Sequence, residues 1–301
     1  MSASLIAIDW GTTAARAYLM NARGDVDDER SSALGIARVE PGRYAEALAA
    51  LLGDWIDHAA PRLACGMIGS RQGWVEAPYV ECPASLHTLA AGLARVGTGA
   101  LTVVPGLLTR DRHDVPDVMR GEETQLLGAV AADEAVLAVL PGTHSKWARV
   151  ECGTVVDFAT WMTGELFATL LEHSILGRMA THGGAHSAES FARGVRRGLD
   201  DGALAHDVFG ARTLALVGDL ASHEVGDWLS GLLIAREVRD ARAWAKAAGV
   251  DDLPVRIIGS NVLAERYAIA LAAAGVNADR GASDAAPRGL WRIAGQAGLL
   301  H

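Results

Sequence analysis

The stretch IAIDWGTTAARAY, residues 6–18, reads as a β-strand, a tight Gly–Thr turn and a second β-strand. Such a turn is suited to holding a phosphate group. Gly11 has no Cβ and lets a ligand approach the backbone closely, and Thr12 offers a hydroxyl and an amide. The two common phosphate signatures, G-x-x-x-x-G-K-[ST] and G-x-G-x-x-G, do not occur at this turn. The stretch therefore predicts a hairpin whose tip is a candidate phosphate loop of neither common type.

A second hairpin of the same pattern lies near the middle of the chain. In LAVLPGTHSKWAR, residues 137–149, Gly142 matches Gly11 and Thr143 matches Thr12 at the same offset. An internal duplication of this kind predicts two domains of similar topology. We place them at residues 1–135 and 136–301. Two such hairpins facing each other across a cleft would grip a polyphosphate from both sides, and the alternative is that both are ordinary hairpin turns.

Composition narrows the class of protein. The chain has 301 residues, half of them apolar, and a net charge of −9, which argues against a general nucleic-acid binder or a binder of anionic membranes. The three cysteines, Cys65, Cys82 and Cys152, lie far apart without a C-x-x-C pair, so we expect reduced cysteines and no zinc site. No signal-peptide pattern opens the sequence, and no apolar run reaches the roughly 18 residues of a membrane helix. We expect a soluble, cytoplasmic protein.

Strand and helix patterns alternate along the chain, which predicts an α/β fold. Short β-rich runs predict strands at Leu5–Asp9, Ala17–Met20, Leu63–Gly69, Leu101–Pro105, Val136–Leu140, Lys146–Glu151, Val155–Ala159 and Val255–Gly259. Apolar residues at helical spacing predict helices within residues 43–60, 121–135, 164–176, 224–238 and 261–274.

Several motifs together resemble a known family. DWGTT and the second Gly–Thr hairpin resemble the two phosphate loops of the acetate and sugar kinase/actin superfamily. CGMIGSRQGW, MRGEETQLLG, LPGTHSKW, WMTGELF, WLSGLLIA and IIGSNVLAERY, in this order, are similar to the 2-dehydro-3-deoxygalactonokinase family. The resemblance implies two actin-like (ribonuclease H-like) domains with a nucleotide cleft between them. It also implies transfer of a phosphoryl group from ATP, with Mg²⁺, to the 6-hydroxyl of 2-dehydro-3-deoxy-D-galactonate.

The two hairpins supply the expected phosphate contacts. Asp9 ends a strand and points into the first turn, so it is a candidate Mg²⁺ partner through water, a duty that the resemblance also implies. The alternative is a carboxylate that caps its own turn. Lys146 is a further candidate at the second hairpin. The remaining candidates for binding the ATP phosphates are Gly11, Thr12, Thr13, Arg16, Gly142, Thr143, His144 and Ser145.

Two adjacent carboxylates, Glu122 and Glu123, open a predicted helix just before the second hairpin. Acidic residues are favoured there by the helix dipole alone. In related sugar kinases the catalytic carboxylate, usually Asp, opens a helix at this place, so either Glu is a candidate general base. Neighbouring helix residues point about 100° apart, and only one of the two is able to reach a substrate hydroxyl. The sequence leaves open which one it is.

The loop after Cys65 is crowded with polar groups and resembles a sugar-kinase substrate loop. Its candidate substrate-binding residues are Ser70, Arg71, Gln72 and Trp74. Arg71 is our first candidate for a bidentate contact with the substrate carboxylate. The alternative is a structural arginine that binds loop carbonyls. Thr163 is expected either to line the same pocket or to cap its helix.

A strand-to-helix turn near the C-terminus resembles the adenosine motif of the family, with Gly259, Ser260 and Asn261 beside the base and ribose. Backbone amides at a helix start suit an anion or a nucleotide edge. His182 and His186 lie four residues apart, but the intervening glycine pair argues against a helical metal site.

Two other functions stay open at this level. One is a kinase for a different sugar or sugar acid, and the other is a non-catalytic, actin-like nucleotide-binding protein. The expected partners are a small sugar acid and ATP. The sequence does not decide whether the protein forms a homo-oligomer.

Overall fold

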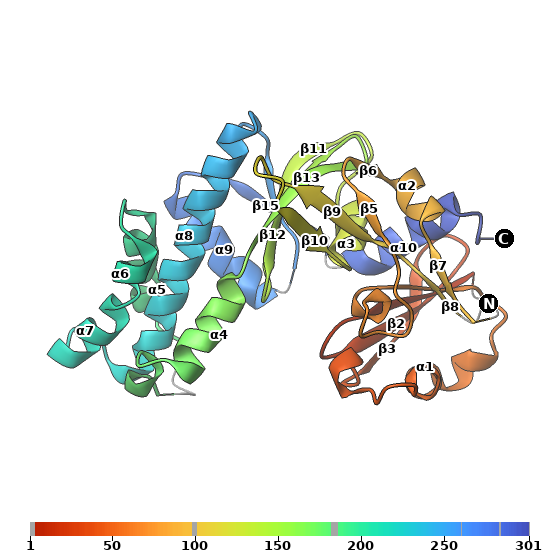
Figure 1. The fold of residues 1–301 in the computed structure, drawn as a ribbon, viewed down its shortest axis with the longest axis horizontal. Helices are drawn as coiled ribbons and strands as arrows, with labels where there is room; N and C mark the ends of the chain where they lie inside the picture. The colour runs from red at the N-terminus through yellow and green to blue at the C-terminus, as the bar shows by residue number, and fades with distance from the viewer. Residues whose placement is uncertain (1–3, 98–100, 182–185, 260, 283, 301) are drawn as a thin grey trace. The chain divides into compact units, whose positions relative to one another are not determined.

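The computed structural model describes residues 4–97, 101–181, 186–259, 261–282 and 284–300 (Figure 1). The chain folds into two compact units. Unit 1 consists of Met1–Ala135, Arg149–Phe158 and Ala282–His301, and unit 2 consists of Val136–Ala148 and Ala159–Gly281. Along the chain, the first passage from unit 1 to unit 2 follows Ala135. Two later segments, 149–158 and 282–301, group with unit 1 rather than with the second half of the chain.

The first sheet of unit 1 has the strand order β3-β2-β1-β4-β8-β7. Its central strand β1 is apolar on both faces because both faces are covered, and Ile6, Ile8 and Trp10 are fully buried. Helix α1 packs its apolar side into the same core. β1 runs antiparallel to β2 and parallel to β4, so the ends of β1 and β4 lie side by side. The bounds are β1 Leu5–Trp10, β2 Ala15–Met20, β3 Val26–Ser32, α1 Tyr44–Leu52, β4 Arg62–Cys65, β7 Ala94–Val96 and β8 Leu101–Val103.

A three-stranded sheet, β10-β9-β5, leads into helix α3. Helix α10 from the end of the chain packs against α3, which explains why residues 282–301 belong to unit 1. The two helices approach closely because a Cβ at Gly128 would lie 1.9 Å from Ala285 O, and one at Gly289 would lie 1.9 Å from Thr124 O. The bounds are β5 Tyr79–Glu81, α2 Leu86–Ala91, β9 Gly106–Arg110, β10 Pro116–Met119, α3 Glu122–Ala129 and α10 Ala285–Gln296.

The third sheet has the order β15-β14-β11-β12-β13-β6. In unit 2, β14 pairs in parallel with β11 and β15, which leaves room for helical connections. In unit 1, β6 pairs with the first two residues of β13. The bounds are β6 Ala84–Ser85, β11 Ala135–Leu140, β12 Ser145–Glu151, β13 Thr154–Trp161, β14 Val255–Ile257 and β15 Ala278–Arg280.

Long helices dominate the rest of unit 2, and α8 runs through their middle (Figure 1). α5 lies against α8 at glycine positions: a Cβ at Gly194 would lie 2.0 Å from Trp228 O, and one at Gly231 would lie 2.2 Å from Phe191 O. Bulkier residues would force the two helices apart. The bounds are α4 Thr163–His173, α5 Ala188–Leu199, α6 Leu204–Asp207, α7 Gly210–Val217, α8 Val225–Ala247 and α9 Asn261–Ala273.

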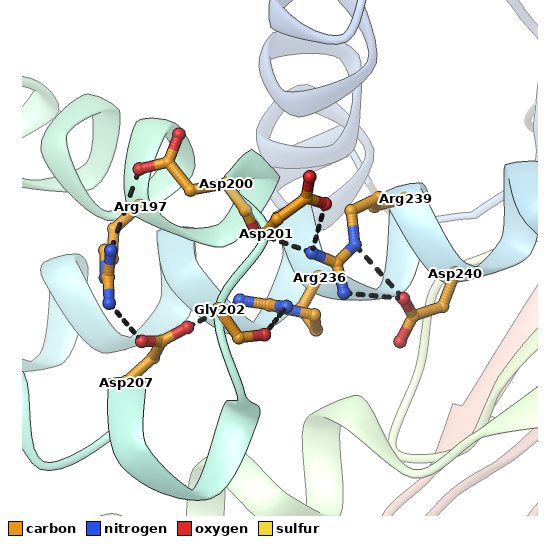
Figure 2. Close-up of polar contacts among 8 residues, drawn as sticks. All are labelled: Arg197, Asp200, Asp201, Gly202, Asp207, Arg236, Arg239 and Asp240. Atoms are coloured by element: carbon orange, nitrogen blue, oxygen red, sulfur yellow. Dashed lines mark hydrogen bonds and ion pairs between the residues drawn. The ribbon is translucent and has the colours of Figure 1, made fainter.

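A buried carboxylate ties α5, α6 and α8 together (Figure 2). Asp207 has a fully buried side chain and pairs with Arg197 through one oxygen and with Arg236 through the other, the second pair at 2.6 Å. Arg236 also donates to Gly202 O. Gly202 carries no side chain for a reason of space, since a Cβ there would lie 2.2 Å from Asp207 Oδ2. The cluster fixes the α5–α6 connection on the surface of α8.

Several predicted elements differ from the structure in their extent, and two of them end earlier at a glycine. The predicted strand 63–69 ends at Cys65, because Gly66 takes a φ of 90° and a 3₁₀ turn, Met67–Gly69, follows. The helix predicted within residues 43–60 ends at Leu52, where Gly53 takes a φ of 53°. The edge strands β3 and β7 were not predicted, because β3 is mostly exposed and polar and β7 has only three residues. Among the described residues, no helix combines the length and the apolar character that crossing a bilayer requires.

Candidate active site

The tip of the β1–β2 hairpin is held open toward solvent. Gly11 N donates to Ala14 O at 2.9 Å, which closes the turn, and the neighbouring backbone supports it: Ile36 N donates to Gly11 O at 3.0 Å. Thr12 and Thr13 are exposed. The tip therefore presents the hydroxyls and amides that the sequence predicts for a phosphate loop.

Asp9 lies beside this tip, at the end of β1. It is half-buried, and burial raises the pKa of its carboxyl, as does the charge of Glu122, while Arg16 opposes the rise. Asp9, Gly11, Thr13, Ala14 and Arg16 line a cavity of about 170 Å³. The carboxylate thus faces a small space next to the Gly–Thr tip.

The donor set fits a hydrated Mg²⁺ ion, which commonly keeps several waters and takes one or two carboxylates. Within the described part of the chain, no three His, Cys, Asp or Glu side chains are grouped to hold a metal. A single carboxylate, Asp9, beside a small polar cavity suits a metal bound largely through water. A metal ion bound there would neutralise negative charge on the oxygens of the phosphoryl group that is transferred.

Glycines bring α3 up to Asp9. Gly121 precedes the helix with a φ of 109°, and a Cβ there would lie 3.1 Å from Gly66 Cα. Gly66, with a φ of 90°, in turn leaves room for Trp10 O at the end of β1. The helix start and the end of β1 can meet because both intervening positions lack side chains.

The structure separates the two carboxylates at the start of α3. Glu123 is 0% exposed; its Oε2 accepts from Gly121 N at 2.6 Å and its Oε1 from the Thr124 hydroxyl at 2.9 Å. Burial, followed by the charge of Glu122, raises the pKa of Glu123 to about 7. Glu122 is half-buried, and its Oε2 accepts from Arg120 N at 3.1 Å. Of the pair, Glu122 retains exposed surface, and Glu123 fastens the helix start.

The expected substrate loop is closed by its own backbone. Trp74 N donates to Ile68 O and Ala77 N to Gly69 O, each at 2.9 Å. Trp74 stacks on Tyr44 with ring centroids 6.3 Å apart, and the Tyr44 hydroxyl donates to Gln72 O. Trp74 thereby packs against the core of unit 1.

The polar residues of this loop lie in different environments. The Arg71 side chain is 87% exposed and only approaches Glu76, at 3.4 Å. Ser70 is half-buried, and its hydroxyl has neither a partner nor exposed surface. The exposure of Arg71 gives no sign of a preformed carboxylate site around its guanidinium.

The second hairpin carries a hydroxyl, that of Ser145, at the position of Ala14 in the first hairpin. Ser145 is 0% exposed, and its Oγ hydrogen-bonds the Tyr267 hydroxyl at 2.7 Å. Tyr267 donates to Glu237 at 2.6 Å, and Trp147 Nε1 donates to Glu237 at 2.8 Å. The Ser145 hydroxyl therefore belongs to a buried network, and the place of Ser145 in the second phosphate clamp stays a prediction. Thr143 and His144 stay exposed at the tip.

The start of α4 supports this tip. Glu165 N donates to Thr143 O at 3.0 Å, and the Glu165 carboxylate pairs with His144. A Cβ at Gly164 would lie 2.5 Å from Gly142 O, so glycine is needed for this close approach. Thr163 is the first helical residue rather than the N-cap, which is Met162. Its side chain instead bonds Glu237 in the buried network.

Unit 2 contains a cavity of about 540 Å³ that sequence reasoning missed. Its walls are mostly apolar, and one polar cluster faces it: Asp227 accepts from Arg266 and contacts His186 Nδ1, both at 2.7 Å. Burial alone would raise the pKa of Asp227, but hydrogen bonds, first from Ser187 N and then from His186 and Arg266, together lower it. The lining includes Gly142, Thr163, Phe167, Leu171, Leu233, Ile234, Val262, Leu263 and Tyr267.

The predicted adenosine motif adjoins this cavity. Gly259 has a φ of 151°, which side-chain-bearing residues rarely adopt, and α9 begins at Asn261. Val262 and Leu263, directly after the motif, line the cavity. Ser260 and His182 lie outside the described residues, and the contacts of the Asn261 side chain are likewise outside them. Asp227 and Arg266 were missed because they are 39 residues apart in sequence and only folding joins them.

The fold and the two Gly–Thr hairpins define the chain as an α/β protein with the actin-like fold. Component A of (R)-2-hydroxyglutaryl-CoA dehydratase from Acidaminococcus fermentans shares this fold, with a TM-score of 0.54 at 13% identity over 97% of this chain and 98% of that one.

The family is narrower than the fold. Residues 9–293 match the sequence pattern of the 2-keto-3-deoxy-galactonokinase family, and the chain belongs to this family of kinases. It is 36% identical to 2-dehydro-3-deoxygalactonokinase of Escherichia coli K12 over 286 residues, which is 95% of each chain. A crystal structure from Sinorhizobium meliloti, of a protein for which the same activity has been suggested, superposes with a TM-score of 0.87 at 36% identity, covering 96% of this chain and 98% of that one.

Proposed function

We propose that the protein transfers the γ-phosphoryl group of ATP to the 6-hydroxyl of 2-dehydro-3-deoxy-D-galactonate. The observation that carries the proposal is the meeting of Asp9, the Gly–Thr tip and Glu122 within unit 1. Phosphoryl transfer requires a neutralised phosphate, a metal partner and an oriented nucleophile. These residues supply one group for each requirement.

Glu122 acts in this proposal as the base that orients and deprotonates the 6-hydroxyl. Its surface is accessible, whereas both oxygens of Glu123 are engaged inside the protein. A general base must come within hydrogen-bond distance of the proton that it takes. Glu123 would then act through the backbone, since its bond to Gly121 N fixes the helix start that carries Glu122.

The nucleotide is proposed to lie with its base in the unit 2 cavity. Apolar walls suit the faces of an adenine ring, and a few polar groups suffice for orientation. Gly142 belongs both to the cavity lining and to the second hairpin, so the phosphates would follow from the cavity to that tip. In unit 1, Thr12 and Thr13 are proposed as phosphate ligands, and Asp9 would contact Mg²⁺ through water.

The proposal is tested with purified protein, ATP and Mg²⁺ against a panel of 2-keto-3-deoxy sugar acids and neutral sugars. We expect turnover of the galactonate derivative and little turnover of neutral sugars. Glu122→Gln should lower kcat by about 10²–10⁴, the range for loss of a general base, with a small change in KM. Glu123→Gln is the matched control and should retain activity.

Other outcomes identify the alternatives. Turnover of a different sugar acid at a higher kcat/KM would replace the substrate and leave the kinase class intact. Nucleotide binding without turnover of any compound in the panel would favour a non-catalytic actin-like protein. Equal loss of kcat in both Gln variants would refute the division of roles between the two glutamates. A cytoplasmic location and a homo-oligomeric state stay predictions.

A further inference from the structure

Arg120 is a buried cation that has no counterion among the described residues. It is 8% exposed, and its Nη2 donates to Ala77 O at 2.9 Å while its Cζ lies 4.4 Å above the Tyr79 ring. Its Nε and Nη1 have no hydrogen-bond partner. No carboxylate in the described part of the chain forms an ion pair with it. Burying a charge in this way costs several kcal/mol unless another charge compensates it.

A second unpaired donor belongs to the loop beside Arg120. The Ser70 hydroxyl is buried and has no partner. Its neighbour Gly69 lies close to the guanidinium, since a Cβ on Gly69 would be 3.0 Å from Arg120 Nη1. Native proteins leave few buried polar atoms unsatisfied, and each such atom calls for an explanation. Here several donors meet around one loop and lack a negatively charged acceptor.

Arg120 connects the proposed base, Glu122, with the Ser70 loop. Glu122 accepts from the backbone N–H of Arg120, while the Arg120 side chain extends to the Ser70 loop. An arginine side chain is about as long as a six-carbon acid, so one molecule can reach both ends of this path. Its terminal hydroxyl would lie near Glu122 and its carboxylate near the guanidinium.

We infer that Arg120, assisted by the Ser70 hydroxyl, binds the C1 carboxylate of the sugar-acid substrate. The inference rests on the proposed function and assigns the specificity for acids to this residue in place of Arg71. The unpaired donors have no exposed surface, so the loop from Gly69 to Ala77 must shift outward to admit the carboxylate. The shift must break the Arg120–Ala77 bond and some of the backbone hydrogen bonds that close the loop, while Trp74 can stay packed on Tyr44 as the anchor of the loop.

The test compares the sugar acid with its C1 amide, which keeps the shape and removes the charge. Loss of a buried charge pair costs about 10²-fold or more in affinity, so wild-type protein should prefer the acid by about that factor in kcat/KM. Arg120→Met should bring the ratio of acid to amide close to one, with the KM for ATP unchanged. Arg71→Met is the matched control, because Arg71 lies on the Ser70 loop and its side chain is exposed. This variant should keep the wild-type ratio of acid to amide.

Each outcome decides the inference. An unchanged ratio in folded Arg120→Met, or a ratio lost in Arg71→Met instead, would overturn it, and a purely structural arginine would lower activity on acid and amide alike. If Arg120→Met does not fold, Arg120→Lys and Ser70→Ala must each reduce the ratio several-fold. If wild-type protein turns over no acid, the proposed function fails. The inference is then tested by calorimetric binding of 2-dehydro-3-deoxy-D-galactonate to wild type and to Arg120→Lys. Binding to wild type that is lost in Arg120→Lys supports the inference, and any other result overturns it.

Discussion

Replacing Glu123 by Gln should make the free energy of unfolding less dependent on pH. Burial, and then the charge of Glu122, raises the pKa of the Glu123 carboxyl from its ordinary 4.5 to about 7. Gln keeps the shape: its carbonyl oxygen is able to accept from Gly121 N, and its amide nitrogen to donate to the Thr124 hydroxyl. The substitution therefore removes the ionisation and preserves both hydrogen bonds.

The direction of the pH effect follows from which state holds the proton. Between 4.5 and about 7, folded protein keeps a proton on Glu123 that the unfolded chain releases. The contribution of Glu123 to stability is therefore complete below pH 4.5, declines as the pH rises, and is lost above about pH 7. The difference between about 7 and 4.5, at about 1.4 kcal/mol for each pH unit, corresponds to about 3 kcal/mol.

Urea unfolding of wild type, Glu123→Gln and Glu122→Gln at about pH 5 and about pH 8.5 measures this difference. Hydrogen exchange of peptides from α3 reports unit 1 separately from unit 2. From about pH 5 to about pH 8.5, the free energy of unfolding of Glu123→Gln should rise by about 2–3 kcal/mol relative to that of wild type. Glu122→Gln, which alters a half-buried side chain, should gain much less. An equal difference between wild type and Glu123→Gln at both pH values would refute the reasoning.

Three further predictions concern the hairpins and the packing of unit 2. Gly164→Ala should destabilise the protein by about 1–3 kcal/mol, because the new methyl overlaps the backbone of the second hairpin, and it should raise the KM for ATP in steady-state assays. Thr12→Ala and Thr143→Ala should each weaken ATP use; wild-type affinity and turnover in the double variant would contradict a shared nucleotide. Asp207→Ala should cost about 3–5 kcal/mol in thermal or urea unfolding because it leaves a buried guanidinium unpaired, whereas Asp201→Ala, at an exposed position, should leave the transition unchanged.

The parts of the fold that the sequence could predict are those with strong local signals. The strand pattern of residues 5–9 predicted β1 to within one residue, and the helical spacing of residues 225–238 predicted the first part of α8, which continues to Ala247. The turn at Gly66 could not be foreseen as the end of a strand, because its φ of 90° depends on α3 packing next to it. Likewise, nothing local indicates that the last helix returns to α3.

The candidate site was predictable in residue types but not in orientation. The pair Glu122 and Glu123 was found from its place at a helix start, yet only the packing of α3 decides which carboxylate is buried. Arg71 was predicted to bind the substrate carboxylate because it lies in a polar loop, whereas Arg120, next to a helix start, carried no local signal of a binding role. In the structure the Arg71 side chain is exposed to solvent, and two donors of the buried Arg120 have no hydrogen-bond partner.

The two hairpins show how a duplication can lead to different chemistry. Both tips keep Gly–Thr, but the position of Asp9 in the first hairpin is occupied by Leu140 in the second. At this strand position the first hairpin therefore carries a carboxylate and the second an apolar residue. Unit 1 gathers the acidic groups suited to metal and proton handling, and unit 2 provides the apolar cavity suited to a nucleotide base. Exchanging Asp9 for Asn should therefore abolish turnover while leaving nucleotide binding, measured by calorimetry without Mg²⁺, nearly unchanged. A loss of metal-free nucleotide binding would show instead that both units hold the nucleotide through their charges.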